Sequence, residues 1–177
     1  AGLTKSGKVT IPAGQLSAKI TPTFPVNGDT LLEANETFTV TLGTPETANT
    51  IVSDTAKVGT GTVTNDDQVT VSITDKVQQT EGNSGTKNFD FTVTIDQAAA
   101  IDVVVPYTFA HVTTNAADFT GLTTTGKVTI PAGQTSVKVT PTFAVNGDTS
   151  LEADETFTVT LSTPETSGAV LSATAKV

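Results

Sequence analysis

Apolar and polar residues alternate along most of the chain with a period of two. In residues 156–161 (TFTVTL), Phe157, Val159 and Leu161 fall on one side and three threonines fall on the other. Such alternation predicts β-strands with one buried face, and β-branched threonine suits the exposed face. The same pattern recurs in residues 89–95. No stretch shows a helical period, so the pattern predicts an all-β protein.

Turn-forming residues separate these runs. Glycine, proline and asparagine interrupt the alternation at residues 81–85, 131–134, 146–148 and 163–165. The strands expected between these turns lie near residues 69–75, 87–96, 101–110, 125–131, 135–145, 155–162 and from about 171 onward. Short strands in this number are typical of an immunoglobulin-like antiparallel β-sandwich.

The chain contains an internal repeat. Residues 2–58 align without a gap to residues 121–177, at an offset of 119 residues, and 42 of the 57 aligned pairs are identical. A repeat of this length fits one β-sandwich, which typically has about 100 residues. We therefore predict tandem sandwiches of which the first is incomplete. Residues 1–67 would be the C-terminal part of one sandwich, and residues 68–177 a nearly complete second one that lacks the end of its last strand.

The first sandwich would supply only about four of its strands. A half-sandwich exposes the inward apolar positions of its strands, and contiguous apolar surface of that kind is rare on a monomer. The positions concerned are Val9, Ile11, Ile20, Phe24, Phe38, Val40 and Leu42. We therefore expect strands from outside this chain to cover them, supplied by another copy or by adjoining sequence.

Composition and charge disfavour several classes of partner. The chain has 18 acidic residues and 9 basic ones, and its net charge of −9 argues against nucleic acid and anionic membranes. No window approaches the roughly 18 consecutive apolar residues of a membrane span, so we expect no membrane insertion in this segment. Without cysteine there are no disulfides or thiolate metal sites, and any metal would need oxygen ligands.

Four motifs resemble those of the Calx-β domain family and occur in the same order. Residues 146–159 (NGDTSLEADETFTV), with a twin at 27–40, resemble its D-x-x-x-E-x-x-E-x-F-x-V signature. Residues 81–85 (EGNSG) are similar to its E-G-x-x-G turn, residues 117–119 (ADF) to its A-D-[YF] loop, and residues 61–67 (GTVTNDD) to its closing strand end. The resemblance implies a Ca²⁺-binding sandwich. The family occurs in exchanger regulatory domains, integrin tails and tandem arrays of bacterial surface proteins.

The resemblance also implies which acids would bind Ca²⁺, a hard cation that takes about six to eight oxygen ligands. In the family topology the acidic loops converge at one end of the sandwich. The candidate ligands in the second unit are Glu81, Asp118, Asp148, Glu152 and Glu155. Those in the first unit are Asp29, Glu33, Glu36, Asp66 and Asp67.

Two departures from the acid-rich members of the family predict modest affinity or a single site. Gly28 and Gly147 stand where paired acids are frequent, and Asn35 stands where the second unit has Asp154. We expect a Kd typical of extracellular modules, about 10⁻⁴ to 10⁻³ M. The competing interpretation is that the acids only cap turns and keep the loops soluble, although carboxylates crowded without a cation repel one another.

We expect a protein that is not an enzyme. Nucleophilic catalysis needs a base near a nucleophile, and His111, the single histidine, is expected to have no catalytic role at the surface or at a strand edge. With no tryptophan and one tyrosine, a glycosidase or lectin would have little to stack a sugar ring on. An ice-binding threonine array is also disfavoured, because any solvent-facing strand of a threonine-rich protein shows that pattern. The sequon at Asn35 is interpreted as coincidental.

The predicted function is structural and extracellular or at the cell surface. The junction at Asp67–Gln68 leaves almost no linker, so adjacent units should form a stiff rod, with Ca²⁺ neutralising the acids at the junction. Such a rod suits an adhesin stalk, a biofilm matrix protein or a filament whose partners are adjoining repeats or other copies. A more specific form of this structural hypothesis is a homopolymer in which exchanged β-strands link the chains end to end. The alternative is a regulatory Ca²⁺ sensor of the exchanger type, which predicts denser acids and adjoining membrane spans.

Overall fold

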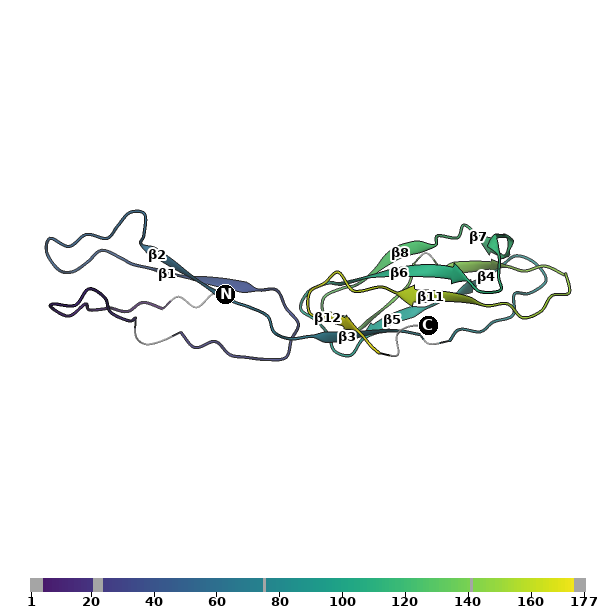
Figure 1. Ribbon diagram of the computed structural model, residues 1–177, viewed down its shortest axis with the longest axis horizontal. Helices are drawn as coiled ribbons and strands as arrows, with labels where there is room; N and C mark the ends of the chain where they lie inside the picture. Colours follow the sequence, from purple (N-terminus) through teal and green to yellow (C-terminus); the bar gives the residue numbers. More distant parts are fainter. Residues whose placement is uncertain (1–4, 21–23, 75, 141, 174–177) are drawn as a thin grey trace.

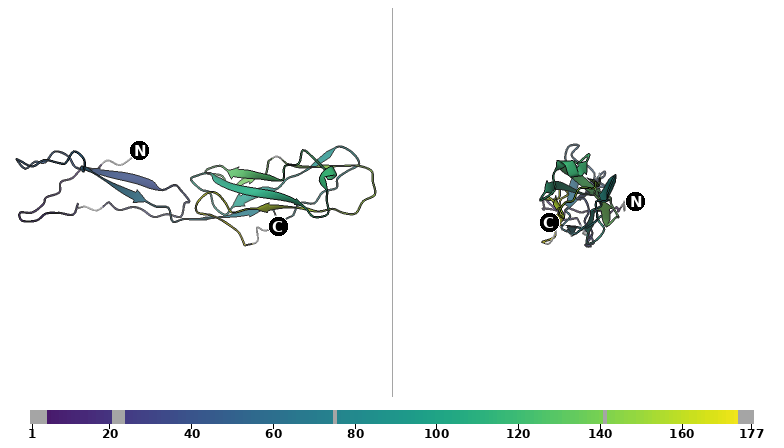
Figure 2. Two further views of the ribbon diagram at one scale, coloured as in Figure 1. Left: turned by 45° about the horizontal axis from the view of Figure 1, so that its top comes forward. Right: turned by 90° about the vertical axis from the view of Figure 1, so that its right-hand side faces the viewer.

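The computed structural model describes residues 5–20, 24–74, 76–140 and 142–173. The chain forms two lobes that lie end to end along the axis of an elongated molecule, which is narrow when viewed along that axis (Figures 1 and 2). We refer to residues 5–67 as the first unit and to residues 68–173 as the second unit. In the described part of the chain the regular elements are strands, together with one short 3-10 turn.

The first sheet of the second unit has three strands. β6 (Val103–His111) lies in the centre and pairs antiparallel with β8 (Thr125–Ile130) on one side and with β11 (Phe157–Leu161) on the other. The alternation predicted from the sequence gives β6 its two faces, since Val103, Val105, Tyr107 and Phe109 are buried. This sheet is one half of the predicted sandwich.

The opposite sheet of the second unit is broken into two segments. Its strands are β3 (Val69–Ile73), β4 (Thr86–Phe89), β5 (Thr92–Ile95), β7 (Phe119–Thr120), β9 (Ser136–Lys138), β10 (Phe143–Asn146) and β12 (Ala169–Leu171). They are ordered β12-β3-β5-β9 in one segment and β4-β10-β7 in the other. The backbone N–H of Val139 donates to the Phe91 carbonyl at 2.9 Å and links the segments. The β12–β3 pair is parallel, an exception in a sheet that is otherwise antiparallel.

Two long strands predicted from the sequence are each interrupted. The expected strand 87–96 is β4 and β5, and the expected strand 135–145 is β9 and β10. The two predicted strands still pair with each other on both sides of the interruption, but Phe89 lies opposite Phe143 whereas Thr92 lies opposite Lys138, so the register shifts by two residues there. The short strand β7 and the preceding 3-10 turn η1 (Ala116–Asp118) were not expected from the alternation.

The first unit contains fewer strands than expected. Its described residues form one antiparallel hairpin of β1 (Glu36–Thr41) and β2 (Val58–Val63), rather than about four strands. Residues 7–15 are identical to residues 126–134, yet only the later copy contains a strand. That strand, β8, pairs with β6, and the first unit has no counterpart of β6 among its described residues.

The apolar face of the first unit is open to solvent, as the sequence predicts for a half-sandwich. The most exposed of the anticipated positions is Ile11 at 56%, and Val9, Phe24, Phe38 and Leu42 are also exposed. Ile20 and Val40 are half-buried. That strands from outside this chain cover this face stays a prediction.

Candidate metal site and inter-unit junction

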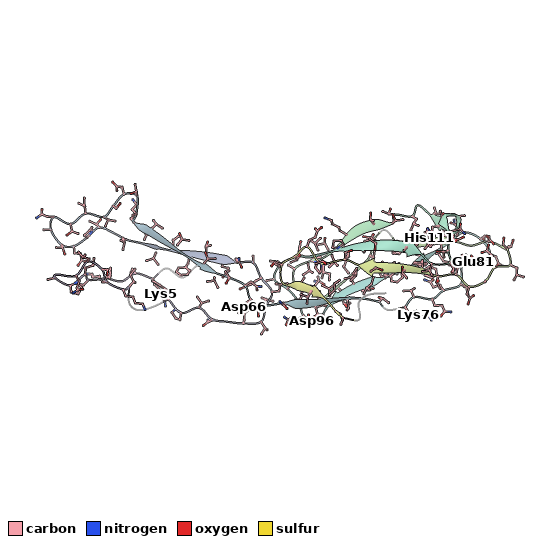
Figure 3. All side chains as sticks on the ribbon, viewed as in Figure 1. Lys5, Asp66, Lys76, Glu81, Asp96 and His111 are labelled. Atoms are coloured by element: carbon pink, nitrogen blue, oxygen red, sulfur yellow. The ribbon has the colours of Figure 1, made fainter. Side chains whose placement is uncertain are left out.

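The acids predicted for the second unit gather at the end of the molecule far from the junction. Glu81 comes from the turn between β3 and β4, and Asp148 and Glu152 come from the long loop between β10 and β11. Carboxylate oxygens of these three residues all lie within 4.8 Å of one another. Glu81 lies at this end in Figure 3, and Asp66 lies near the junction. We call Glu81, Asp118, Asp148, Glu152 and Glu155 the distal cluster.

Asp118 and Glu155 extend this constellation. Asp118 closes the 3-10 turn, because its carboxylate accepts hydrogen bonds from the backbone N–H and, at 3.3 Å, from the side-chain amide of Asn115. Partial desolvation, the negative charge of Asp118 and a hydrogen bond with it raise the pKa of Glu155. The charge of Asp148, followed by desolvation and the charges of Glu81 and Asp118, raises the pKa of Glu152. The five carboxyls therefore act on one another as a single electronegative site.

Gly147 allows the two acidic loops to meet. A Cβ at this position would lie 2.6 Å from the carbonyl oxygen of Gly82 and 2.7 Å from that of Glu81. The backbone N–H of Gly147 also donates to the Gly85 carbonyl at 2.9 Å. The missing acid at position 147 is therefore explained by close backbone approach, a reason that the sequence did not reveal. At the equivalent Gly28 no atom lies within 4 Å, because the described first unit has no such turn beside it.

The acids of the first unit lie at the junction. Partial desolvation, followed by the charges of Asp29, Glu36 and Asp67, raises the pKa of Glu33. Desolvation and the charges of Asp66 and Asp29 raise the pKa of Asp67. All five predicted residues thus interact, and we call them the junction cluster. Within the described ranges, only the distal cluster brings three acids to within 4.8 Å, so the junction cluster is the looser of the two.

A leucine beside the junction cluster enters the core of the second unit. Leu32 belongs to the first unit but is fully buried, in the same cluster as Val69, Ala99 and Val103. Its carbonyl accepts a hydrogen bond of 2.8 Å from the backbone N–H of Ala100. A large apolar side chain within a polar acidic turn was the only sequence signal for this contact, and the sequence reasoning missed it.

Polar contacts surround this leucine on both sides of the junction. The Asn65 side chain accepts from the Glu33 backbone N–H at 3.1 Å and donates to the Asp67 carbonyl at 3.0 Å. From the second unit, the Gln97 amide donates to the carbonyls of Thr30 at 2.8 Å and Gln68 at 3.2 Å. The acidic loop, the linker and the second unit are therefore joined in one network.

Comparison with protein families identifies one domain family in both units. The model of the Calx-beta domain matches residues 8–67 and 64–177. The chain belongs to the Calx-beta domain family. Calx-beta domains are non-catalytic modules associated with Ca²⁺. Comparison with curated proteins gave no match.

The residues of the distal cluster fit the cation associated with Calx-beta domains. Every candidate ligand is a carboxylate, and hard cations such as Ca²⁺ prefer oxygen. The three ion pairs among the described residues (Lys8–Glu46, Lys127–Glu165 and Lys138–Asp90) leave these acids out, so no direct ion pair offsets their mutual repulsion. A divalent cation would relieve it.

The single histidine of this Calx-beta chain serves local packing. His111 is exposed at the end of β6, where its Nδ1 lies 2.9 Å from Thr114 Oγ1 and its ring packs edge-on against Phe109. No helix in the described part of the chain has the length and apolarity needed to cross a membrane.

Proposed function

We propose that this chain is an extracellular structural module in which Ca²⁺ stiffens a rod of Calx-beta sandwiches. The main support for the proposal is that one loop of the first unit contains both acids of the junction cluster and the residue that contacts the second unit. The Asp29–Glu36 loop both contributes three acids of the junction cluster and inserts Leu32 into the second unit. A cation bound at this cluster would hold the loop and Asp67 together. It would thereby restrict bending between the units.

The distal cluster supports the same function at the other end of the second unit. Its three closest acids come from two loops, so a bound cation would fix those loops relative to each other. The clusters occupy equivalent loops of the two units, because Asp29 and Asp148 are equivalent in the repeat. A rod built from such units would carry one acidic cluster per unit along its axis.

Calorimetric titration with Ca²⁺ tests the binding part of the proposal. We expect heat in the millimolar range or below, and weaker binding after Glu152→Gln in the distal cluster. Glu165→Gln is the matched control, because Glu165 is a glutamate of the same unit that pairs with Lys127 at 2.6 Å, outside the cluster. Absence of heat from the unaltered chain up to several millimolar Ca²⁺ would refute Ca²⁺ binding.

Distance measurements between the units test the rod. The chain has no cysteine, so Thr60→Cys and Ser84→Cys give one exposed labelling site on each unit. We expect Ca²⁺ to narrow the distribution of distances between fluorescent or spin labels, and chelator to broaden it. The double variant Glu33→Gln/Asp67→Asn should abolish the response. A distribution that is unaffected by Ca²⁺ would contradict the role in stiffening.

The open apolar face of the first unit supports a further part of the proposal, that a neighbouring copy covers it. Phe24 and Phe38 pack against each other at 6.1 Å between ring centres, yet both remain exposed. A β-strand from a second copy would provide backbone partners for residues 7–11, which have the same sequence as residues 126–130 of β8. Sedimentation velocity should then detect dimers or longer assemblies, and Ile11→Asp should dissociate them. A chain that stays monomeric at high concentration would contradict this assembly.

A further inference from the structure

The second unit carries a copy of the leucine that docks the first unit. Leu151 is equivalent to Leu32 in the repeat, but its side chain is fully exposed (103%), whereas Leu32 is 0% exposed. The turn that presents each leucine is the same. Asp29 accepts a hydrogen bond from the backbone of Leu31 at 2.9 Å, and Asp148 accepts one from the backbone of Ser150 at 2.6 Å. The loop therefore holds Leu151 in the same way as Leu32, but Leu151 has no neighbouring surface of the kind that buries Leu32.

The surface that receives Leu32 depends on a glycine. Gly168 has a φ of +86°, and a Cβ there would lie 2.5 Å from Leu32 Cδ1 and 2.8 Å from the Asp67 carbonyl oxygen. Any side chain at this position would displace the leucine. We call the surface formed by Gly168, Ala99 and Ala100 the socket. The absence of a side chain at Gly168 is what gives the socket room for leucine.

The described residues contain no second socket for Leu151. The socket of the second unit is filled by Leu32. At the position of Gly168 the first unit has Asn49, which keeps the left-handed backbone with a φ of 61° but adds a side chain. Copies of this chain therefore cannot take up one another's Leu151 through this contact. The partner must be a different unit, with glycine at the position of Gly168.

We propose that Leu151 and the loop around it form the docking surface for a further Calx-beta unit of the same kind as the second unit. The inference rests on the proposed function, because it requires an array of such units. In the docked state the leucine side chain fills the socket of the next unit, and its carbonyl accepts a hydrogen bond from the residue equivalent to Ala100. The distal cluster then becomes a junction cluster, joined by the linker acids equivalent to Asp66 and Asp67.

An extended chain tests this contact. Val177 is equivalent to Val58, so appending residues 59–173 after Val177 continues the repeat in register. Leu151→Ala should lower the docking equilibrium of the appended unit by on the order of 10- to 100-fold, because it removes three buried carbons. The measurement is the width of the distance distribution between labels on the second and appended units. In the original chain, the same variant should leave the unfolding midpoint unchanged.

A second variant keeps the test decisive if Leu151→Ala changes the distance distribution only slightly. Gly168→Asn in the appended copy places a side chain in the socket, and asparagine tolerates a left-handed backbone, as Asn49 does at the same position in the first unit. Its Cβ would also press against the linker carbonyl equivalent to that of Asp67. This variant should broaden the distance distribution at least as much as Leu151→Ala does, and adding Leu151→Ala to it should broaden the distribution no further. Measurements in chelator separate this contact from Ca²⁺ binding, since the leucine effect should persist there. A junction unaffected by either variant would overturn the proposal, even if Ca²⁺ still stiffens the rod.

Discussion

Replacement of Leu32 by alanine should destabilise the second unit, although Leu32 belongs to the first. The variant removes three carbons from a side chain that is 0% exposed. At about 0.8 kcal/mol for each buried methylene, the loss is about 2.4 kcal/mol. Core leucine-to-alanine changes cost about 2–5 kcal/mol, and the upper values include an empty cavity. The socket lies at the surface between two units and can admit water, so we expect about 2 kcal/mol.

The chain offers an intrinsic probe for this measurement. It has no tryptophan and one tyrosine, Tyr107, which lies buried in the core of the second unit. Tyrosine fluorescence during urea unfolding therefore reports the second unit. With a slope of about 1–2 kcal/mol/M, a loss of 2 kcal/mol lowers the midpoint by about 1–2 M.

Leu151→Ala is the control for Leu32→Ala, because it makes the same chemical change at an equivalent position that is fully exposed. It should leave the urea midpoint unchanged. Equal effects of the two variants, or no effect of Leu32→Ala, would refute the docking of Leu32 as a source of stability. A lower midpoint for Leu32→Ala alone would establish that the first unit stabilises the second across the junction.

Three further predictions follow from particular contacts. Gly168→Asn should lower the urea midpoint at least as much as Leu32→Ala, and Leu32→Ala should add little to it, because each change removes the Leu32 side chain from the socket. Raised pKa values of Glu152 and Glu155 make ionisation unfavourable in the folded state, so stability in chelator should fall as the pH rises above the ordinary value of 4.5. Urea midpoints at several pH values check this, and saturating Ca²⁺ should reverse the trend. Hydrogen bonds to the Asp96 carboxylate, first among them that from the Thr70 backbone, lower its pKa in the folded state. The ionised carboxylate therefore stabilises the fold at pH values above its ordinary pKa of 3.8, and this stabilisation is lost as the pH falls through the lowered pKa of the folded state. Asp96→Ala should cost about 1 kcal/mol at neutral pH, measured by urea unfolding, and little in strong acid.

The sequence by itself determined the local structure of both units. Residues 7–15 and 126–134 are identical, and both form the same turn, with a hydrogen bond of 3.0 Å from Gln15 to Pro12 and from Gln134 to Pro131. Gly14 and Gly133 have φ angles of 79° and 78°. Such turns close within a few residues, so their energetics depend on the nearby sequence alone. The period-two alternation likewise predicted most strands of the second unit, though not β7 or the two interruptions, and the acidic motifs identified candidate ligands in both units.

The tertiary structure decided which of these identical segments became strands and which leucine became buried. A strand needs a partner for its backbone groups, and β8 has β6, whereas residues 7–15 have no equivalent partner among the described residues. Similarly, the loops of Leu32 and Leu151 share one local structure, but only Leu32 meets a socket. Burial and strand pairing are free energies of contact between segments distant in the sequence. Repeated sequence therefore gives the same turns wherever it occurs, but different packing according to what lies beside it.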